Sequence, residues 1–321
     1  LTANTAARNT GVGSCVLCAT STGADNTAVG YNALAANTTG TDNVAVGSGA
    51  LDANTTASNN TAVGDNALSA NTTGATNTAV GADALLGNTT AANNTAVGNA
   101  ALIVTTEGGA NTGVGHAALY SNITGTANVA MGSNAMQNNT ANNNIAIGYF
   151  SMVANTTGTQ NVAVGTTALD ANITGSYNTA FGFNALTASL ASNNTAVGWN
   201  ALGANTTGAN NTALGYEAGQ SGSPGGAVTT GDNQLCLGDE NVTHAHVQVD
   251  WTIASDARDK TDVEDLSIGL DFVKQLKPKT YRWDKRSQYS KDQTILPDGS
   301  HKTNQLDVGF LAQDVDALEK S

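Results

Sequence analysis

The chain contains few charged and few aromatic residues. Asp, Glu, Lys and Arg make up 12% of its 321 residues, and Phe, Trp and Tyr make up 5%. Both fractions are too low for an ordinary globular enzyme of this length. No run of 18 apolar residues occurs, so no membrane-spanning helix and no membrane partner are predicted. The chain begins at Leu1 without a basic segment and an apolar stretch, so no signal peptide is evident.

Basic residues are almost absent before residue 255. Residues 1–215 hold seven acids and one base, Arg8, and residues 216–254 hold five acids and no base. Residues 255–321 hold thirteen acids and eleven bases. A nucleic-acid surface needs a basic face to meet phosphates, so we expect no nucleic-acid partner. The change in composition also predicts a domain boundary after residue 254.

A five-residue phrase, Asn-Thr-Ala-Val-Gly with small variations, recurs through residues 9–215. The interval between copies is 17 residues or, twice, 16 residues. A fixed period in this range is typical of a solenoid. The thirteen copies begin at Asn9, Asn26, Asn43, Asn60, Asn77, Asn94, Asn111, Asn128, Asn144, Asn161, Asn178, Asn194 and Asn211.

Each unit contains two short apolar phrases separated by turn residues, so we predict a coil with two strands. Strand side chains alternate between faces. We therefore expect Thr27 and Val29 to line a narrow core opposite Leu34, whose column includes Met136. The position of Ala28 holds only Ala or Gly in all thirteen copies, which predicts close packing against a neighbouring chain.

The repeat resembles the head repeats of trimeric autotransporter adhesins, which are left-handed parallel β-rolls. This resemblance covers about residues 9–215 and implies three rolls packed around one axis. The fold class that we predict is mainly β, with a homotrimeric parallel β-solenoid shaft over residues 1–218.

Two features of the shaft suggest chemistry but have simpler explanations. Cys15 and Cys18 form a C-x-x-C pair, yet no second Cys or His pair lies at metal-ligand spacing. We favour packing in a small core over metal or redox use. The repeated Asn-Thr-Thr, as at Asn37, satisfies the glycosylation sequon. We attribute it to turn formation instead, because Asn bonds its own backbone in turns.

The repeat ends after Gly215. Residues 219–254 form a Gly/Ser-rich loop, a degenerate copy of the repeat at 234–238, and a predicted strand at 243–251. This strand places His244 and His246 on one face. In a trimer they offer six imidazoles to one axial metal, but we favour the simpler explanation of two surface or interface histidines on a short strand. Whether they bind a metal is left open, and no cofactor is predicted.

Residues 255–321 form a different, small α+β domain. A capping box at Thr261 and Glu264 starts a predicted helix that runs to Pro278. Strands are predicted at 280–283 and from Val308, the second running into a last helix. Three segments in this order carry a specific resemblance: Ser255-Asp256-Ala257-Arg258-Asp259-Lys260, Leu276-Lys277-Pro278 with Tyr281-Arg282-Trp283, and Gly309-Phe310-Leu311-Ala312-Gln313-Asp314-Val315.

These segments resemble the C-terminal intramolecular chaperone of phage tail spikes and fibres, the self-cleaving family of endosialidases. The resemblance implies a domain that trimerises, templates the fibre before it and then cuts itself off. It also implies a long C-terminal helix beyond Ser321, so we expect an incomplete chaperone. Cleavage is predicted between Ala254 and Ser255, with Ser255 as nucleophile and Lys260 as its base. That role requires burial or Arg258 to lower the pKa of Lys260.

Together these observations predict a phage tail fibre, assembled in the host cytoplasm and resident in the virion. Its partners would be two further copies, other tail proteins and a polysaccharide or protein receptor on the host. The alternatives are a trimeric surface adhesin, an ice-binding solenoid suggested by Thr ladders, and a depolymerase. A depolymerase needs two carboxylates flanking a glycosidic bond, for which Asp25 and Asp42 in adjacent coils are the candidates.

Overall fold

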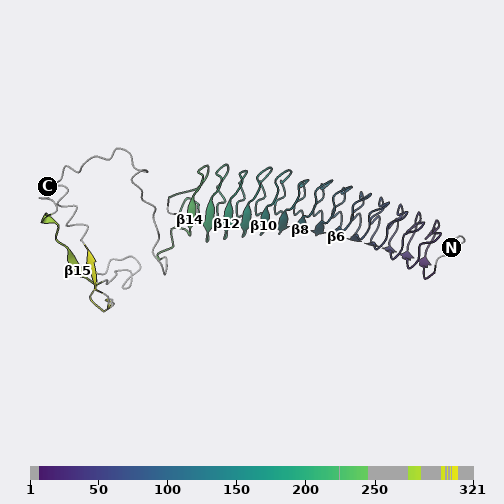
Figure 1. Ribbon diagram of the computed structural model, residues 1–321, viewed down its shortest axis with the longest axis horizontal. Helices are drawn as coiled ribbons and strands as arrows, with labels where there is room; N and C mark the ends of the chain where they lie inside the picture. Colours follow the sequence, from purple (N-terminus) through teal and green to yellow (C-terminus); the bar gives the residue numbers. More distant parts are fainter. Residues whose placement is uncertain are drawn as a thin grey trace. The chain divides into compact units, whose positions relative to one another are not determined.

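The computed structural model describes residues 7–223, 225–244, 274–282, 298–300, 302, 304 and 306–309. The chain divides into two compact units, residues 1–246 and residues 247–321. The predicted boundaries at residues 218 and 254 stay predictions, because residues around 254 lie outside the described ranges. Figure 1 shows the first unit as a stack of similar coils.

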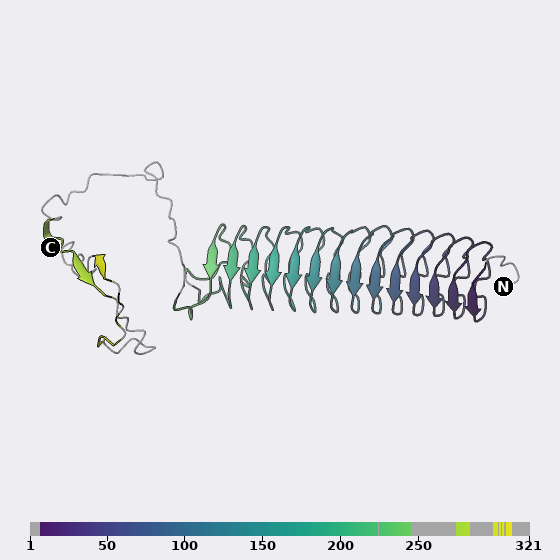
Figure 2. The same ribbon diagram turned by 60° about the horizontal axis from the view of Figure 1, so that its bottom comes forward.

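The first unit is a parallel β-solenoid, as the repeat predicts. One strand of each coil pairs with the same strand of the next, so that fourteen strands form one sheet in sequence order (Figure 2). Each strand has three residues. They are β1 (Thr10–Val12), β2 (Thr27–Val29), β3 (Val44–Val46), β4 (Thr61–Val63), β5 (Thr78–Val80), β6 (Thr95–Val97), β7 (Thr112–Val114), β8 (Val129–Met131), β9 (Ile145–Ile147), β10 (Val162–Val164), β11 (Thr179–Phe181), β12 (Thr195–Val197), β13 (Thr212–Leu214) and β14 (Leu235–Leu237).

The register follows the period of the sequence. Thr27, Ala28 and Val29 of β2 lie beside Val44, Ala45 and Val46 of β3, and the other pairs repeat this alignment. Cys236 of β14 lies beside Ala213 of β13. The degenerate copy after residue 231 therefore forms one more coil.

The structure reverses the predicted faces of the strand. Ala28 and the equivalent alanines are fully buried inside their own coil, whereas Thr27 and Val29 are only half-buried and point outward. The predicted contact of Ala28 with a neighbouring chain is wrong. The interior is narrow because a leucine enters from the opposite wall, so only a methyl group fits there and β-branched side chains take the outer face.

The second phrase forms turns, so the predicted second strand is also wrong. Asn32 and Leu34 have φ values of 57° and 51°, in the left-handed region that reverses the chain instead of extending it. Leu34 is nevertheless completely buried. The small or turn-forming residues at the position of Asn32, such as Gly49 and Asp83, are the sequence signal of this geometry.

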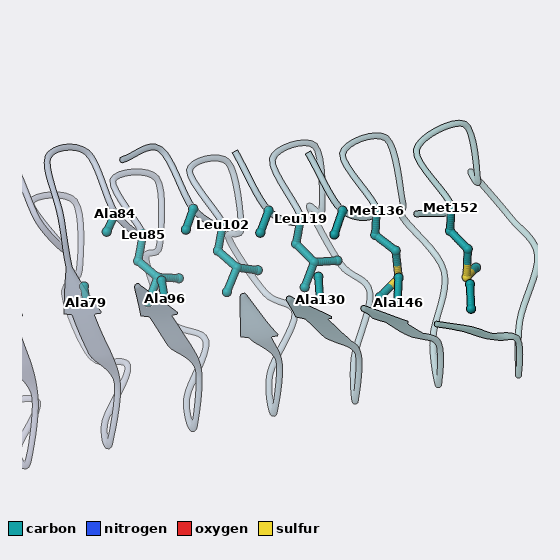
Figure 3. Close-up of a cluster of buried hydrophobic side chains, with 14 of the residues drawn as sticks. Ala79, Ala84, Leu85, Ala96, Leu102, Leu119, Ala130, Met136, Ala146 and Met152 are labelled. Carbon is teal, nitrogen blue, oxygen red and sulfur yellow. The ribbon is translucent and has the colours of Figure 1, made fainter. Parts of the chain in front are cut away.

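The apolar core is a single column of leucine and methionine side chains facing alanines. Figure 3 shows Leu85, Leu102, Leu119, Met136 and Met152 pointing from the turns toward the alanines of the strands. The column is fully buried, so the predicted placement of Met136 in it is confirmed. Its members are Leu17, Leu34, Leu51, Leu68, Leu85, Leu102, Leu119, Met136, Met152, Leu169, Leu186 and Leu202.

The other half of the interior is a ladder of buried asparagines at the start of each phrase. The side chain of Asn26 accepts a hydrogen bond from the backbone N–H of Asn43 in the next coil (3.0 Å) and donates to the carbonyl of Gly40 (2.9 Å). Asn77 makes the same two bonds, with Asn94 (2.9 Å) and Ala91 (2.9 Å). Each amide thus satisfies backbone groups of successive coils.

A second asparagine column lies in the Asn-Thr-Thr-Gly turn. Asn37 donates to the carbonyl of Gly40 at 3.0 Å, and Asn54 donates to the side-chain oxygen of Asn37 at 3.0 Å. Where the next coil has another residue in this column, the ladder breaks. The side-chain oxygen of Asn88 faces Thr105 in sequence register and has no partner among the described residues, and the same holds for Asn172 before Ser189.

Glycine ends every strand for two reasons. Gly30 has a φ of 140°, which is strained for any other residue, and a Cβ there would lie 2.3 Å from the carbonyl oxygen of Gly47 in the next coil. The two 16-residue units lose one residue from their polar turn, where Ala141 and Ala191 supply the carbonyls that Asn128 and Asn178 bind.

The loop after β13 packs onto the last coils. Val228 is buried in the core cluster. The hydroxyl of Ser223 accepts a hydrogen bond from the N–H of Gly219 (2.7 Å) and lies 3.1 Å from the carbonyl of Gly238. The predicted loop is therefore held in place against the end of the shaft.

Replacing Asn77 by Ala removes the acceptor of the Asn94 N–H and the donor to the Ala91 carbonyl. Each buried group left unpaired costs about 1–3 kcal/mol, so we expect a clear fall in the thermal unfolding midpoint. Asn99→Ala is the control in the next coil, because Asn99 is exposed and its loss should cost within about 0.5 kcal/mol. Equal effects of the two substitutions would contradict the structural role of the ladder.

Candidate functional site

The outward face of the long sheet carries an exposed apolar stripe. The third residue of each strand points away from the core and is apolar in every described coil; Val80, for example, is 37% exposed and Phe181 is 55% exposed. Threonines and other β-branched residues at the first strand position lie beside this stripe. The more exposed members are Val12, Val63, Val80, Val97, Met131, Ile147, Phe181, Val197, Leu214 and Leu237.

An aromatic ladder lies two residues beyond this stripe in three successive coils. The rings of Phe183 and Trp199 are stacked with centroids 6.0 Å apart and planes 7° apart. Trp199 and Tyr216 are stacked at 5.0 Å and 9°. All three side chains are exposed. Because neighbouring strands are about 4.8 Å apart, the rings stack along the direction in which the coils follow one another.

The candidate carboxylates of a depolymerase are not set up for acid–base chemistry. Asp25 forms a two-pronged ion pair with Arg8 of the first coil, one prong being 2.6 Å long. This hydrogen bond from Arg8 holds the pKa of Asp25 below its ordinary value. A general acid requires a raised pKa. Asp25 is thus a surface ion-pair residue.

The pKa of Asp52 is shifted in the opposite direction from that of Asp25, but no carboxylate lies at the same repeat position in the adjacent coils. Partial burial raises the pKa of Asp52. The equivalent positions in the adjacent coils are Ala35 and Ser69, so the pair of carboxylates that glycoside hydrolysis uses is not assembled at this column. The ion pair of Asp25 and the surroundings of Asp52 therefore give the depolymerase alternative no support.

The structural explanation holds for the Asn-Thr-Thr sequon but not for the pair of cysteines. Asn37 is completely buried and hydrogen-bonded within its turn, so the structural explanation of the sequon is confirmed. The predicted core packing of Cys15 and Cys18 is wrong. Both side chains are exposed, and their sulfur atoms lie 2.8 Å apart. The core positions of this coil belong to Val16 and Leu17.

The predicted cleavage and metal residues fall largely outside the described ranges. Ala254, Ser255, Lys260 and His246 all lie in undescribed segments, so their predicted roles stay predictions. His244 is exposed, with its Nδ1 2.9 Å from the hydroxyl of Thr243. Within the described residues, no group of three or more His, Cys, Asp or Glu could hold a metal ion.

The described part of the second unit brings two of the three chaperone-like segments together. β15 (Lys279–Tyr281) pairs antiparallel with β16 (Asp307–Gly309), so that Thr280 lies beside Val308. Gly309 lies against the ring of Tyr281, since a Cβ added there would be 3.4 Å from it. Arg282 donates a hydrogen bond to the carbonyl of Asn304.

These two strands agree with the strands predicted near residues 280 and 308. Of the predicted helix before Pro278, the structure describes residues 274–277. Lys274 and Gln275 are helical but Leu276 and Lys277 are not, so the helix ends two residues earlier than predicted. A helix long and apolar enough to cross a membrane was not found in the part of the chain that is described.

The chain thus joins a parallel β-solenoid to a C-terminal segment of another kind. Residues 255–320 match the family described as chaperone of endosialidase, which confirms the resemblance seen in the sequence. The combination of shaft and intramolecular chaperone fits a phage tail fibre or tail spike. Searches of curated proteins and of solved structures returned no match.

The sequence contains signals for two features that were missed. Phe183, Trp199 and Tyr216 occupy one repeat position, so their stacking follows from the period alone. The exposed stripe was missed because a valine column was equated with a core. The restriction to Ala or Gly at the position of Ala28 correctly indicated that little space is available on that face of the strand. The space is limited by Leu34 of the same coil and not by a neighbouring chain.

Proposed function

We propose that this chain is the shaft and C-terminal chaperone of a homotrimeric phage tail fibre that attaches the virion to its host. The observation that carries the proposal is the match of residues 255–320 to the endosialidase chaperone family behind a shaft of fourteen paired strands. A chaperone at one end suits such a shaft, because near-identical coils invite pairing errors by one whole repeat.

The trimer interface in this proposal is the outward Thr/Val face. An apolar stripe that runs along fourteen strands is larger than a soluble monomer normally exposes. Two further copies of the chain are the occupants that we propose. Each copy repeats the same residues at the same strand spacing, so three stripes can meet along their whole length. The flat rows of threonine and valine would then be buried between chains.

Replacing Val63, Val80 and Val97 together by Asp should prevent trimerisation, because three carboxylates would be buried without partners. Light scattering should report a trimer for the wild type and a monomer or aggregate for the variant. The matched control replaces the exposed Thr56, Thr73 and Thr90 by Asp.

This control adds the same charge in three successive coils but on the polar turn. It should remain a trimer. A wild-type monomer, or trimers in both variants, would contradict the proposed interface.

The chaperone then cleaves the bond between Ala254 and Ser255. In the proposed step, Lys260 removes the proton of the Ser255 hydroxyl, and the oxygen attacks the carbonyl carbon of Ala254. The bond from that carbon to the Ser255 nitrogen breaks, and Lys260 returns the proton to the leaving amine. Water then hydrolyses the ester between Ala254 and the Ser255 oxygen, which leaves a carboxylate on Ala254 and a free Ser255 hydroxyl. Lys260 must lose its own proton near neutral pH, which requires burial or a nearby cation such as Arg258. After cleavage the shaft loses its template, so its assembled state is kinetically locked.

Ser255→Ala and Lys260→Ala should each give an uncut chain that still forms trimers, visible as the full intact mass. Lys260→Arg tests the base specifically, because Arg keeps the charge but does not deprotonate in proteins. It should also remain uncut. Release of the C-terminal fragment at the wild-type rate by any of these variants would refute the serine–lysine pair.

Host attachment is assigned to the shaft surface that carries the aromatic ladder. Exposed Trp and Tyr are enriched at binding surfaces because they combine apolar area with a polar tip. Trp199 and Tyr216, both exposed, also carry an indole N–H and a hydroxyl that can donate hydrogen bonds to a receptor. A polysaccharide or protein of the host envelope is the proposed receptor.

Trp199→Ala should weaken binding of the purified fibre to host envelopes by about tenfold or more, since central aromatic contacts are worth roughly 2 kcal/mol. The measurement is a pull-down on isolated envelopes with quantified bound fibre. Tyr31→Ala is the control, because Tyr31 is exposed at the same repeat position in an early coil. Unchanged binding by Trp199→Ala would remove the ladder from the receptor site.

A further inference from the structure

The first coil contains a thiol pair that no other coil has. Cys15 and Cys18 are exposed, and the thiol of Cys18 donates a hydrogen bond to the sulfur of Cys15 at 2.8 Å. A disulfide is about 2.05 Å long, so the two atoms need to approach by less than 1 Å to bond. The third cysteine, Cys236, is buried in the last coil.

The turn that holds the pair has the right frame for a disulfide. In later coils the equivalent positions are the first and fourth residues of a hydrogen-bonded turn, as in Ala35 N–H to Asn32 carbonyl at 3.2 Å. Such residues have Cα atoms closer than about 7 Å, and disulfides span about 4.4–6.8 Å between Cα atoms. Ordinary turn geometry therefore places Cys15 and Cys18 within bonding range.

This turn supports the first side chain of the core column. Leu17 lies between the two cysteines, is almost completely buried and has a φ of 54°. Its N–H donates to the carbonyl of Ala33 (3.2 Å), and that of Ala19 donates to Ala35 (3.0 Å). Among the described strands, β1 pairs with β2 alone, and these two described hydrogen bonds of the turn both run to the second coil.

A second contact also fastens this coil to its neighbour. The ion pair between Arg8 and Asp25 joins the first coil to the second. Arg8 is the only basic residue of the first 215, as the thiol pair is the only one in the repeats. The thiol pair and the basic side chain, which the other repeats lack, therefore both occur in the first described coil of the sheet.

We propose that Cys15 and Cys18 form a reversible disulfide that closes the turn around Leu17 and holds the first coil on the shaft. Small-molecule disulfides of the glutathione type are the oxidant. The Cys15 thiolate attacks one sulfur of that disulfide and expels a thiolate. Cys18 then attacks the Cys15 sulfur and expels the second small thiol. The protein loses two electrons and two protons, and one disulfide is reduced to two thiols.

The redox conditions around the protein determine whether Cys15 and Cys18 are free thiols or a disulfide. Reducing cytoplasm keeps such thiols free, and oxidising surroundings close them. In the fibre proposed above, the coil would fold with free thiols and lock after release from the host. This timing rests on the proposed function, whereas the formation of the disulfide does not.

The test treats the full chain with oxidised glutathione, or with dithiothreitol as the reduced reference. Free thiols should fall from three to one, and the intact mass should fall by two hydrogen atoms with no adduct. Cys18→Ser should instead gain one glutathione on Cys15. Three free thiols, glutathione adducts on both wild-type cysteines, or disulfide-linked chains would each overturn the proposal.

Hydrogen exchange tests the holding role separately. The amides of Leu17 and Ala19 should exchange at least threefold more slowly in the oxidised protein, whereas those of the equivalent Leu68 and Ala70 in the fourth coil should not change. The double variant with Ser at positions 15 and 18 should show no response to glutathione. A disulfide that forms without added protection at Leu17 would contradict a role in holding the coil.

Discussion

The buried asparagine ladder is the interaction on which the shaft depends. A coil of 17 residues is too narrow for a conventional core, and its turns leave backbone N–H and carbonyl groups inside. Asn26 and its equivalents bind those groups in the same coil and in the next one. Leaving a buried amide without a partner costs more free energy than a satisfied hydrogen bond contributes. The residue is therefore Asn in all thirteen repeat copies, whereas its exposed neighbours vary.

The narrow interior determines what the surface carries. Each coil encloses little more than one Leu or Met and two alanines, so the β-branched residues of the strand remain outside. The shaft therefore has an apolar stripe along its length and few charges to cover it. The proposed trimer would bury this stripe between chains, and a C-terminal chaperone would suit a shaft whose near-identical coils invite pairing errors by one whole repeat.

The first and last described coils of the sheet carry residues that the repeat does not have. Near β14, the loop that carries Val228 and Ser223 packs against the last coils. Near β1, Arg8 forms an ion pair with Asp25 of the next coil, and the thiols of Cys15 and Cys18 lie in contact. These residues add local chemistry and leave the course of the coil unchanged.

The sequence by itself determined the solenoid, its parallel register and the chaperone segment, because a period of 17 specifies which residues stack and because three ordered motifs specify the family. It did not determine which face of Thr27-Ala28-Val29 lies inside, since alternation allows both choices. The tertiary structure decided this through the left-handed turn at Leu34, which drives that side chain inward and leaves room for only a methyl group opposite. The same turn brings Cys15 and Cys18 together, a proximity that depends on backbone φ values and not on the spacing of residues alone.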